Sequence, residues 1–352
     1  MIPDEVQIAD RAIGPDHSPF VIAEMSGNHN QSLERAFEIV DAAANAGAHA
    51  LKLQTYTADT MTLDVDRDEF KILDSSSLWH GRHLHELYEQ AHTPWAWHGP
   101  IFERARERGL IVFSSPFDES AIEFLESLNA PAYKIASFEL TDLRLIATAA
   151  RTGKPLVMST GMANLAEIDD AVSCARQHGC DQIVLLKCTS TYPATPESTN
   201  LRTIPHLQQC FQTQVGLSDH TAGVGVAVAA VALGATAIEK HFTLSRADGG
   251  VDAAFSLEPD ELKSLIVESE RAWQALGSIQ YGATGSQRKS LMFRRSIFIS
   301  EDVAAGQVVQ PSQIRIIRPG HGLAPGLWER VCGRTARRDL QRGEPTDWDM
   351  FV

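Results

Sequence analysis

Short apolar segments alternate with longer amphipathic segments from about residue 19 to residue 276. The short segments are apolar on both faces, as parallel strands covered by helices must be. The longer segments repeat apolar residues every three to four positions, which predicts helices, for example at 33–47, 119–129, 165–179 and 259–277. The eight predicted strands span 19–25, 49–56, 110–117, 132–137, 155–161, 182–189, 214–220 and 237–243.

Eight repeats of strand and helix predict an α/β fold of the (β/α)8 TIM-barrel type, with a doubly wound open sheet as the alternative. The position of the polar residues distinguishes the two. Every predicted strand ends in polar or charged groups, such as Glu24, Lys52, Ser115, Lys134 and Ser159. In a closed barrel these ends converge on one mouth, where barrel active sites lie, so the pattern favours the barrel.

A polar insertion at 57–94 follows the second predicted strand, and its length suits a flap over the mouth. His83 and His85 lie within it, and we interpret them as solvated loop residues rather than metal ligands.

The character of the chain changes after Gly277. A Gly/Ser-rich linker at 278–290 precedes short β-like runs separated by turns, which predict a small β-rich domain at 291–352. We therefore expect a barrel domain at 1–277, a linker and a second domain.

Composition narrows the class of protein. The chain has 352 residues, 43% hydrophobic and 22% charged, which is ordinary for a soluble globular protein. The net charge of −14 argues against nucleic-acid or anionic-membrane partners. The N-terminal stretch lacks the pattern of a signal peptide, and five cysteines without a CxxC pair indicate a reducing compartment. We expect a cytoplasmic protein with no membrane partner.

Two histidines, His220 and His241, end neighbouring predicted strands. Residues two apart on a strand share a face, so Ser218 and Glu239 should point the same way as these histidines. Two imidazoles with oxygen ligands suit Mn, Mg, Co, Zn or Fe. A single such histidine is more often a hydrogen-bonded core residue, but the pair favours a divalent metal.

Lys52 and Lys134 end the second and fourth predicted strands. Buried lysines are rare unless paired. Together with serines such as Ser137, Ser159 and Ser218, they would form a socket for a phosphate or phosphonate. Ion pairs with barrel glutamates are the alternative, and the two interpretations are compatible.

Motifs occur along nearly the whole chain: FVIAEMSGNHNQSLERA, LKLQTY, YKIASFEL, STGMANLAEI, CTSTYPA, GLSDHT, EKHFTL and SLEPDEL. In this order they resemble the sialic acid synthase family. The C-terminal RRSIFISEDVAAGQVV and IRPGHGL resemble that family's antifreeze-like SAF domain, a β-clip fold. Three segments depart from the sialic acid synthase pattern and look like the family's pseudaminic acid synthase branch: EMSGNH at 24–29, CTSTYP at 188–193 and GGVDAAFS at 249–256.

The resemblance implies a transferase reaction. Phosphoenolpyruvate condenses with 2,4-diacetamido-2,4,6-trideoxy-β-L-altropyranose and water, giving the nonulosonic acid product and phosphate. It also implies a divalent metal, with Mn2+ favoured and Mg2+ or Co2+ as alternatives, and a domain-swapped homodimer. An N-acetylneuraminate or legionaminic acid synthase is the alternative within this family. A carbohydrate- or ice-binding protein with a degenerate barrel is the alternative of another class.

The resemblance also implies a role for each candidate residue. His220 and His241 would bind the metal. Glu24, Glu139 and Asp252 would be the catalytic carboxylates. Gln54 and Tyr192 would line the sugar, and Arg318 would reach it across the dimer. Phosphoenolpyruvate would be held by Lys52, Lys134, Ser137, Ser159, Ser190 and Ser218, where Ser190 replaces the family's asparagine.

Overall fold

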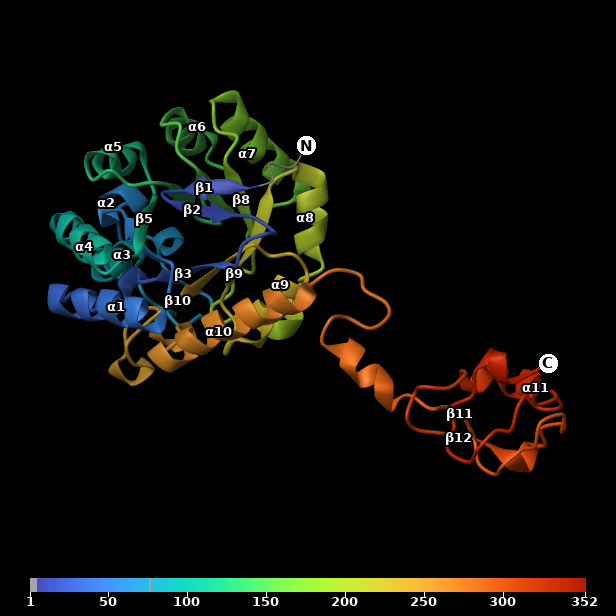
Figure 1. Ribbon diagram of the computed structural model, residues 1–352. Helices are drawn as coiled ribbons and strands as arrows, with labels where there is room; N and C mark the ends of the chain where they lie inside the picture. Colours follow the sequence, from blue (N-terminus) through green and yellow to red (C-terminus); the bar gives the residue numbers. More distant parts are fainter. Residues whose placement is uncertain (1–4, 76) are drawn as a thin grey trace. The chain divides into compact units, whose positions relative to one another are not determined.

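The computed structural model describes residues 5–75 and 77–352 and divides into two compact units between Gly277 and Ser278. In the first unit, eight parallel strands close into a barrel in the order β10-β3-β4-β5-β6-β7-β8-β9 (Figure 1). The predicted barrel is therefore confirmed, and the open sheet is excluded. The strands are β3 Phe20–Glu24, β4 Ala50–Thr55, β5 Ile111–Pro116, β6 Tyr133–Ile135, β7 Leu156–Ser159, β8 Ile183–Cys188, β9 Gln214–Asp219 and β10 Ala237–His241.

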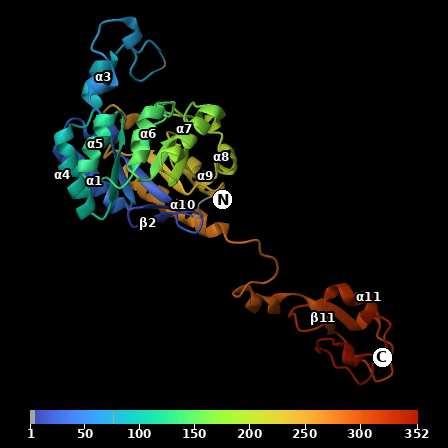
Figure 2. The same ribbon diagram turned by 90° about the horizontal axis from the view of Figure 1, so that it is seen from above.

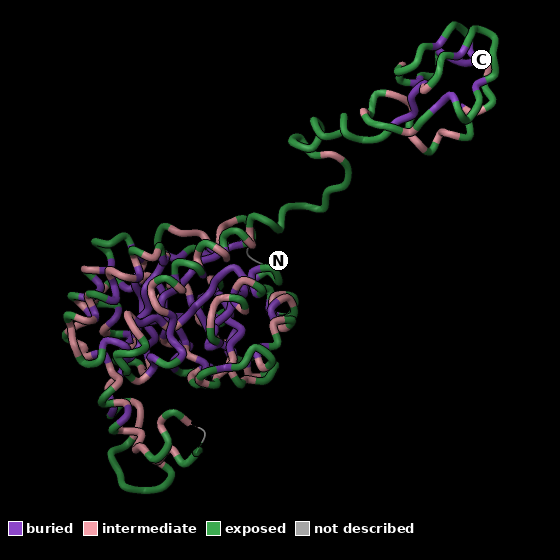
Figure 3. The backbone as a smooth tube through the Cα atoms, turned by 90° about the horizontal axis from the view of Figure 1, so that it is seen from below, coloured by how far each residue is buried: buried purple, intermediate pink, exposed green. Residues whose placement is uncertain are grey.

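Helices surround the strands and bury apolar side chains against the barrel. Side chains at the first turn define where several of them begin: Ser32, Asp118 and Asn164 each accept a backbone N–H as N-caps. The surrounding helices are α1 Leu33–Ala46, α4 Trp95–Glu107, α5 Glu119–Ser127, α6 Leu143–Arg151, α7 Leu165–Gln177, α8 Thr203–Phe211, α9 Gly225–Ala232 and α10 Pro259–Leu276. Figure 3 shows the buried residues concentrated in the strands and on the inner sides of these helices.

Alternation along each strand separates two cores. Outward residues, such as Val21 and Leu51, pack against the helices in the larger apolar cluster. Inward residues near the strand starts, such as Phe20, Ala50 and Phe113, form a second cluster inside the barrel. The inward positions further along the strands are polar, which places chemistry at one end of the barrel.

An N-terminal hairpin, β1 Val6–Ile8 and β2 Arg11–Ile13, covers the other end of the barrel. Val6, Ile8 and Ile13 are at most 1% exposed and belong to the cluster inside the barrel. The sequence pattern did not predict this hairpin, because strands of three residues are too short to show a period.

The insertion at 57–94 lies at the end of the barrel opposite the hairpin (Figure 2). It contains α2 Ala58–Met61, the 3-10 turn η2 Asp68–Phe70 and α3 Leu84–Ala91. His85 is on α3 and its Nε2 lies 2.9 Å from Asp59 Oδ1, so it is a partnered helix residue rather than a solvated loop residue.

The second unit has its own small core. β11 Ser296–Ile299 and β12 Ile314–Ile317 pair antiparallel, α11 Trp328–Val331 is short, and the core includes Ile297 and Val309. The region preceding it ends in the 3-10 turn η6 Gln287–Phe293. Further 3-10 turns are η1 Ser26–His29, η3 Pro196–Ser198, η4 Arg246–Asp248, η5 Ala253–Phe255, η7 Pro311–Gln313, η8 Pro325–Leu327 and η9 Trp348–Met350. Across residues 5–75 and 77–352, no helix is long and apolar enough to cross a membrane.

Candidate active site

The inward polar residues form a ring next to the apolar cluster inside the barrel. Along each strand, the inward positions are apolar near the start and polar near the C-terminal end, and each strand contributes one polar residue to the ring. The ring consists of Glu24, Lys52, Ser115, Lys134, Ser159, Cys188, Ser218 and Glu239, which are all at most 6% exposed.

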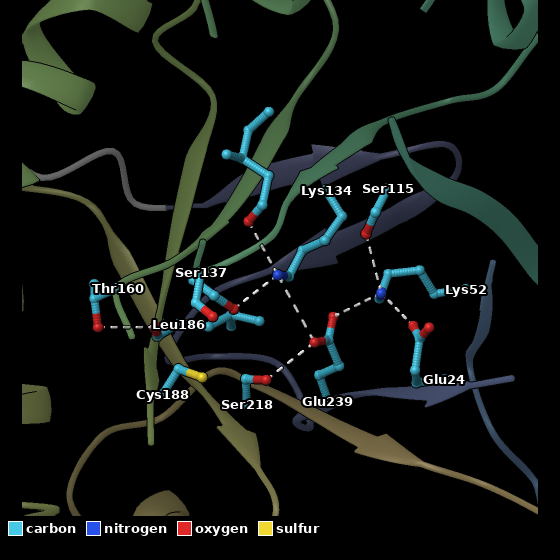
Figure 4. Close-up of polar contacts among 12 residues, drawn as sticks. Glu24, Lys52, Ser115, Lys134, Ser137, Thr160, Leu186, Cys188, Ser218 and Glu239 are labelled. Carbon is cyan, nitrogen blue, oxygen red and sulfur yellow. Dashed lines mark hydrogen bonds and ion pairs between the residues drawn. The ribbon is translucent and has the colours of Figure 1, made fainter. Parts of the chain in front are cut away.

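The two lysines of the ring share buried carboxylates (Figure 4). Lys52 pairs with Glu24, and its Nζ lies 3.9 Å from Glu239 Oε2. Lys134 Nζ lies 3.8 Å from Glu239 Oε1. Lys52 also donates to Ser115 Oγ at 3.1 Å. Both cations are thus held inside the barrel, where an anionic ligand would complement their charge.

The pKa values of the two buried glutamates are shifted in opposite directions by burial and by neighbouring charges. Burial raises the pKa of Glu24 to about 7, against the opposing effect of Lys52. Burial also acts on Glu239, but Lys134 and Lys52 outweigh it and lower the pKa of this carboxyl group. Ser218 Oγ donates to Glu239 Oε1 at 3.0 Å, which favours the same ionised form. The two glutamates are therefore suited to different tasks: Glu239 stays charged, and Glu24 can exchange a proton near neutral pH.

The serines predicted to bind phosphate come together around Lys134. Lys134 Nζ donates to Ser159 Oγ at 2.7 Å, and Ser137 and Ser190 lie 2.8 Å apart, Oγ to Oγ. Gly161 makes room for this pair: its φ is +49°, and a Cβ there would lie 2.4 Å from Ser137 Cβ. The cluster supplies hydroxyl donors beside a cation.

The two predicted metal ligands face each other, with ring centroids 5.4 Å apart. His220 Nδ1 donates to the carbonyl oxygen of Thr189 at 2.9 Å, so Nε2 is the nitrogen left for an ion. Burial lowers the pKa of His220, but hydrogen bonding to Cys188 raises it overall, so an ion would bind this ring in competition with a proton. His241 Nδ1 is buried without a hydrogen-bond partner in the described residues, and Asp252 Oδ2 lies 3.9 Å from it. Burial lowers the pKa of His241 well below its usual value, so the ring is neutral. These donors fit a divalent ion.

The set of protein donors is small, however. Within the part of the chain that the structure describes, no three His, Cys, Asp or Glu side chains form a cluster that could hold a metal ion. The donors that fit an ion are the two imidazoles, so its remaining positions would belong to water or substrate.

A cavity of about 360 Å³ opens beside the ring. Seven of the predicted site residues line it: Gln54, Ser137, Glu139, Ser190, Tyr192, His241 and Asp252. Burial raises the pKa of Glu139 to about 7 and also raises that of Asp252. The other predicted barrel residues do not line it, but three of them, Glu24, Lys52 and Lys134, each stand two positions before a lining residue on the same chain segment.

All three segments that depart from the sialic acid synthase pattern meet at this cavity. Ser26, Ser190, Tyr192, Val251 and Asp252 belong to them and line it. Ser26 Oγ donates to Asp252, which joins the first departure to the third. Ser26 has a φ of +46°, a conformation that costs a residue with a side chain about 1–2 kcal/mol. The hydroxyl is therefore placed here despite backbone strain.

Arg318 lies in the second unit and is exposed. The structure describes that unit by itself, so the predicted reach of Arg318 toward a sugar stays a prediction.

Some residues of the site had no assigned role in the sequence analysis. Glu239 was expected to face inward, but its place between both lysines follows only from barrel closure. Ser115 and Cys188 could have been assigned by counting every second residue along their strands. Cys188 is 2% exposed, and although burial raises its pKa, hydrogen bonding to His220 lowers it overall.

The fold and this site define a TIM-barrel enzyme with a buried lysine pair and a second, SAF-type domain. Residues 39–281 match the NeuB family and residues 294–352 match the SAF domain, so the chain belongs to the NeuB family. It is 41% identical over 329 residues to a pseudaminic acid synthase of Campylobacter jejuni, covering 94% of this chain and 95% of the relative.

Two further comparisons place the chain within this family. An N,N'-diacetyllegionaminic acid synthase of Legionella pneumophila is 34% identical, with 96% of this chain and 95% of the relative covered. The crystal structure of N-acetylneuraminic acid synthetase from Leptospira borgpetersenii, in complex with citrate, superposes with a TM-score of 0.73 at 30% identity. It covers 82% of this chain and 95% of that chain. The predicted family resemblance is confirmed.

Proposed function

We propose that this enzyme condenses phosphoenolpyruvate with 2,4-diacetamido-2,4,6-trideoxy-β-L-altropyranose and water, giving pseudaminic acid and inorganic phosphate. The observation that carries the proposal is the pair of lysines, 2–3% exposed, beside a cavity lined by all three branch-specific segments. The higher identity to a pseudaminic acid synthase than to a legionaminic acid synthase supports the choice of sugar.

Phosphoenolpyruvate carries a phosphate and a carboxylate, and the ring offers a cation for each. We assign Lys52, Lys134, Ser137, Ser159, Ser190 and Ser218 to its binding. Both lysines are already desolvated and held by hydrogen bonds to Ser115 and Ser159, which reduces the cost of ordering them around the anion. Glu239, 3.8–3.9 Å from both lysines, offsets part of their charge before the anion binds.

The reaction develops positive charge on C2 of phosphoenolpyruvate, which a carboxylate can stabilise. C3 of the enol attacks the aldehyde carbon of the open-chain sugar, which forms the new C–C bond and leaves positive charge at C2. The aldehyde C=O becomes a single bond, and its oxygen takes up a proton to become a hydroxyl group. Glu24 and Glu139 are the groups we assign to stabilise that charge and to take a proton from the water that adds at C2. Phosphate leaves C2 with the bridging oxygen, which yields the 2-keto acid. Asp252, Gln54 and Tyr192 would orient the sugar.

A divalent ion held by His220 and His241 would act as a Lewis acid toward the sugar's carbonyl oxygen. We propose Mn2+, with Mg2+ or Co2+ as alternatives, because imidazole with oxygen ligands suits these ions. His241→Ala should abolish metal-dependent activity and lower the affinity for Mn2+ measured by titration. Unchanged Mn2+ affinity in that variant would contradict the assignment.

We extend the proposal to a homodimer in which Arg318 contacts the sugar bound to the other subunit's barrel. Its support is the match of Arg318 to the SAF motif and its exposure, which leaves the guanidinium available to a ligand. Mixing inactive Glu24→Gln and Arg318→Ala chains would restore activity through mixed dimers if the arginine acts in trans. No recovery after dissociation and reassociation would contradict it.

The decisive experiment measures phosphate release from phosphoenolpyruvate with Mn2+ and a panel of sugars. We expect turnover with the altrose-derived diacetamido sugar and much slower turnover with N-acetylmannosamine or the precursor of legionaminic acid. Product mass and NMR identify the nonulosonic acid. Preference for either other sugar would move the enzyme to that branch, and no turnover with any sugar would reject a synthase.

A further inference from the structure

The cavity beside the ring has one polar wall, from the barrel, and one apolar wall, from the insertion at 57–94. We propose that the apolar face of α3 selects the sugar by packing against its methyl groups. This inference rests on the function proposed above and names the part of the substrate that the insertion recognises.

The stripe on α3 has the spacing of one helix face. Leu84, Leu87, Tyr88 and Ala91 stand at positions i, i+3, i+4 and i+7, and all four line the cavity. On other faces of the helix, Glu86, Glu89 and Gln90 are exposed. The apolar face of an amphipathic helix ordinarily packs on a protein core. Here it borders the substrate cavity, so the molecule that fills the cavity should present an apolar face.

The rest of the insertion continues this wall. Met61, Ile72 and Trp79 also line the cavity. The indole N–H of Trp79 donates to the carbonyl oxygen of Val251 at 3.2 Å, so this donor is occupied by the barrel loop. Among the seven lining residues of the insertion, the Tyr88 hydroxyl is then the polar side-chain group left to meet a ligand. Sugar hydroxyls that face this wall would find few partners.

The charged and amide groups of the cavity come from the barrel. Ser26, Gln54, Ser137, Glu139 and Asp252 line it there, among apolar residues that include Phe117 and Phe138. A bound sugar therefore meets hydrogen-bonding groups on one side and apolar groups on the other. Such an arrangement fixes the orientation of the sugar as well as its identity.

Hydrogen bonds hold α3 against the barrel before any sugar binds. Gln31 Nε2, which follows η1, donates to the carbonyl oxygens of Gln90 and His92 at 3.0 and 2.8 Å. His85 pairs with Asp59 across the insertion. The apolar wall is therefore a fixed surface, and little ordering is needed for it to discriminate between sugars.

The proposed substrate suits these two walls. A diacetamido trideoxyhexose carries two acetyl methyl groups and a methyl group at C6, whereas N-acetylmannosamine carries one acetyl methyl group and hydroxyls at C4 and C6. A methyl group gains by burial against Leu84 and its neighbours. A hydroxyl in its place loses water without gaining a partner.

The test compares two sugars that differ at one atom: the diacetamido 6-deoxy sugar and its 6-hydroxy counterpart. We expect the wild-type kcat/KM to favour the 6-deoxy sugar by about 10- to 100-fold, the range a hydrophobic pocket reaches against an added hydroxyl. Leu84→Gln keeps a good helix former and should reduce the preference to about threefold or less. Leu73→Gln is the matched control, because Leu73 lies in the same insertion, is 63% exposed and does not line the cavity.

A binding measurement separates this inference from the proposed reaction. Both sugars are titrated calorimetrically into wild type and Leu84→Gln with phosphoenolpyruvate present. If neither sugar turns over, a binding preference that Leu84→Gln removes would still support the role of α3, while the proposed reaction would fail. Equal binding of both sugars by wild type, or an unchanged preference in Leu84→Gln, would overturn the inference. Met61→Gln provides the same readout should Leu84→Gln fold poorly.

Discussion

The inner and outer faces of β9 and β10 bury charge in different ways. On the outer face, Lys240 Nζ donates to Asp219 Oδ2 at 2.7 Å and also to the carbonyl oxygen of Thr221, so one cation meets one anion. On the inner face, Glu239 lies 3.8–3.9 Å from two lysines and bonds fully to neither. Both arrangements are buried in the same two strands. The outer pair is complete as it stands. In the inner set Lys52 also pairs with Glu24, and Lys134, whose Nζ lies 3.8 Å from Glu239, is the cation most available to an anion.

The variant with the largest expected effect on the inner set is Lys134→Met. Because it removes one of the two inner cations, we expect kcat/KM for phosphoenolpyruvate to fall about 1000-fold, the upper range for losing one preorganised electrostatic group. Phosphate release at saturating sugar measures it. A fall of less than tenfold would mean that Lys134 only balances Glu239.

Lys240→Met tests the outer pair. Leaving Asp219 charged and unpaired should lower the free energy of unfolding by about 3–5 kcal/mol, measured by urea titration. The turnover per folded molecule should stay at the wild-type value, because alternation along β9 and β10 turns both side chains away from the barrel interior. Adding Asp219→Asn should recover part of the stability, since the amide oxygen can still accept the hydrogen bonds from Thr221. If Lys240→Met lost turnover but kept its stability, the outer pair would be functional rather than structural.

The pH dependence of the reaction tests the roles of Glu24 and Glu139. Burial raises the pKa of both Glu24 and Glu139 to about 7. A group that accepts a proton must be ionised, so kcat/KM should fall about tenfold for each pH unit below 7. Glu139→Gln distinguishes the two residues: if the acid limb persists in this variant, it belongs to Glu24. A flat profile from pH 5.5 to 7.5 would exclude both as bases.

The smallest effect concerns Ser190, which replaces the family's asparagine. Ser190→Ala removes one hydroxyl donor from the group assigned to phosphoenolpyruvate. We expect KM for phosphoenolpyruvate to rise about tenfold, because losing one hydrogen bond costs about 1.4 kcal/mol. The value of kcat should change little. Ser198→Ala, on the same loop but away from the cavity, is the control. Equal KM values would place the phosphate elsewhere in the ring.

The barrel could be predicted because its strands are buried on both faces. All eight predicted segments contain the observed strands, and the alternation from Phe20 to Glu24 or from Ala237 to His241 correctly predicts that polar residues face inward at the C-terminal ends of the strands. Ser114 illustrates the limit. It neighbours Ser115 at a strand end, but alternation turns it outward, where its Oγ lies 2.6 Å from Thr55 Oγ1.

The features that sequence reasoning missed depend on contacts distant in the chain. The stripe on α3 is interrupted by His85 and Glu86, so the segment seemed polar until its neighbours were known. The contact of Ser26 with Asp252 joins residues 226 positions apart, which no local pattern reports. The proposed roles of Glu24, His220 and the other site residues rest on family resemblance and geometry, and the variants above test them.

The N-terminal hairpin gives the barrel a single entrance. Because Val6, Ile8 and Ile13 close one end, both substrates must enter and both products must leave on the side of the insertion. Lys52 and Lys134 lie deeper than the residues that line the cavity. Initial-rate and product-inhibition kinetics should therefore report an obligatory sequence, with phosphoenolpyruvate first and the sugar second. A sugar that arrives early would block the passage, so excess sugar should inhibit the enzyme when phosphoenolpyruvate is scarce.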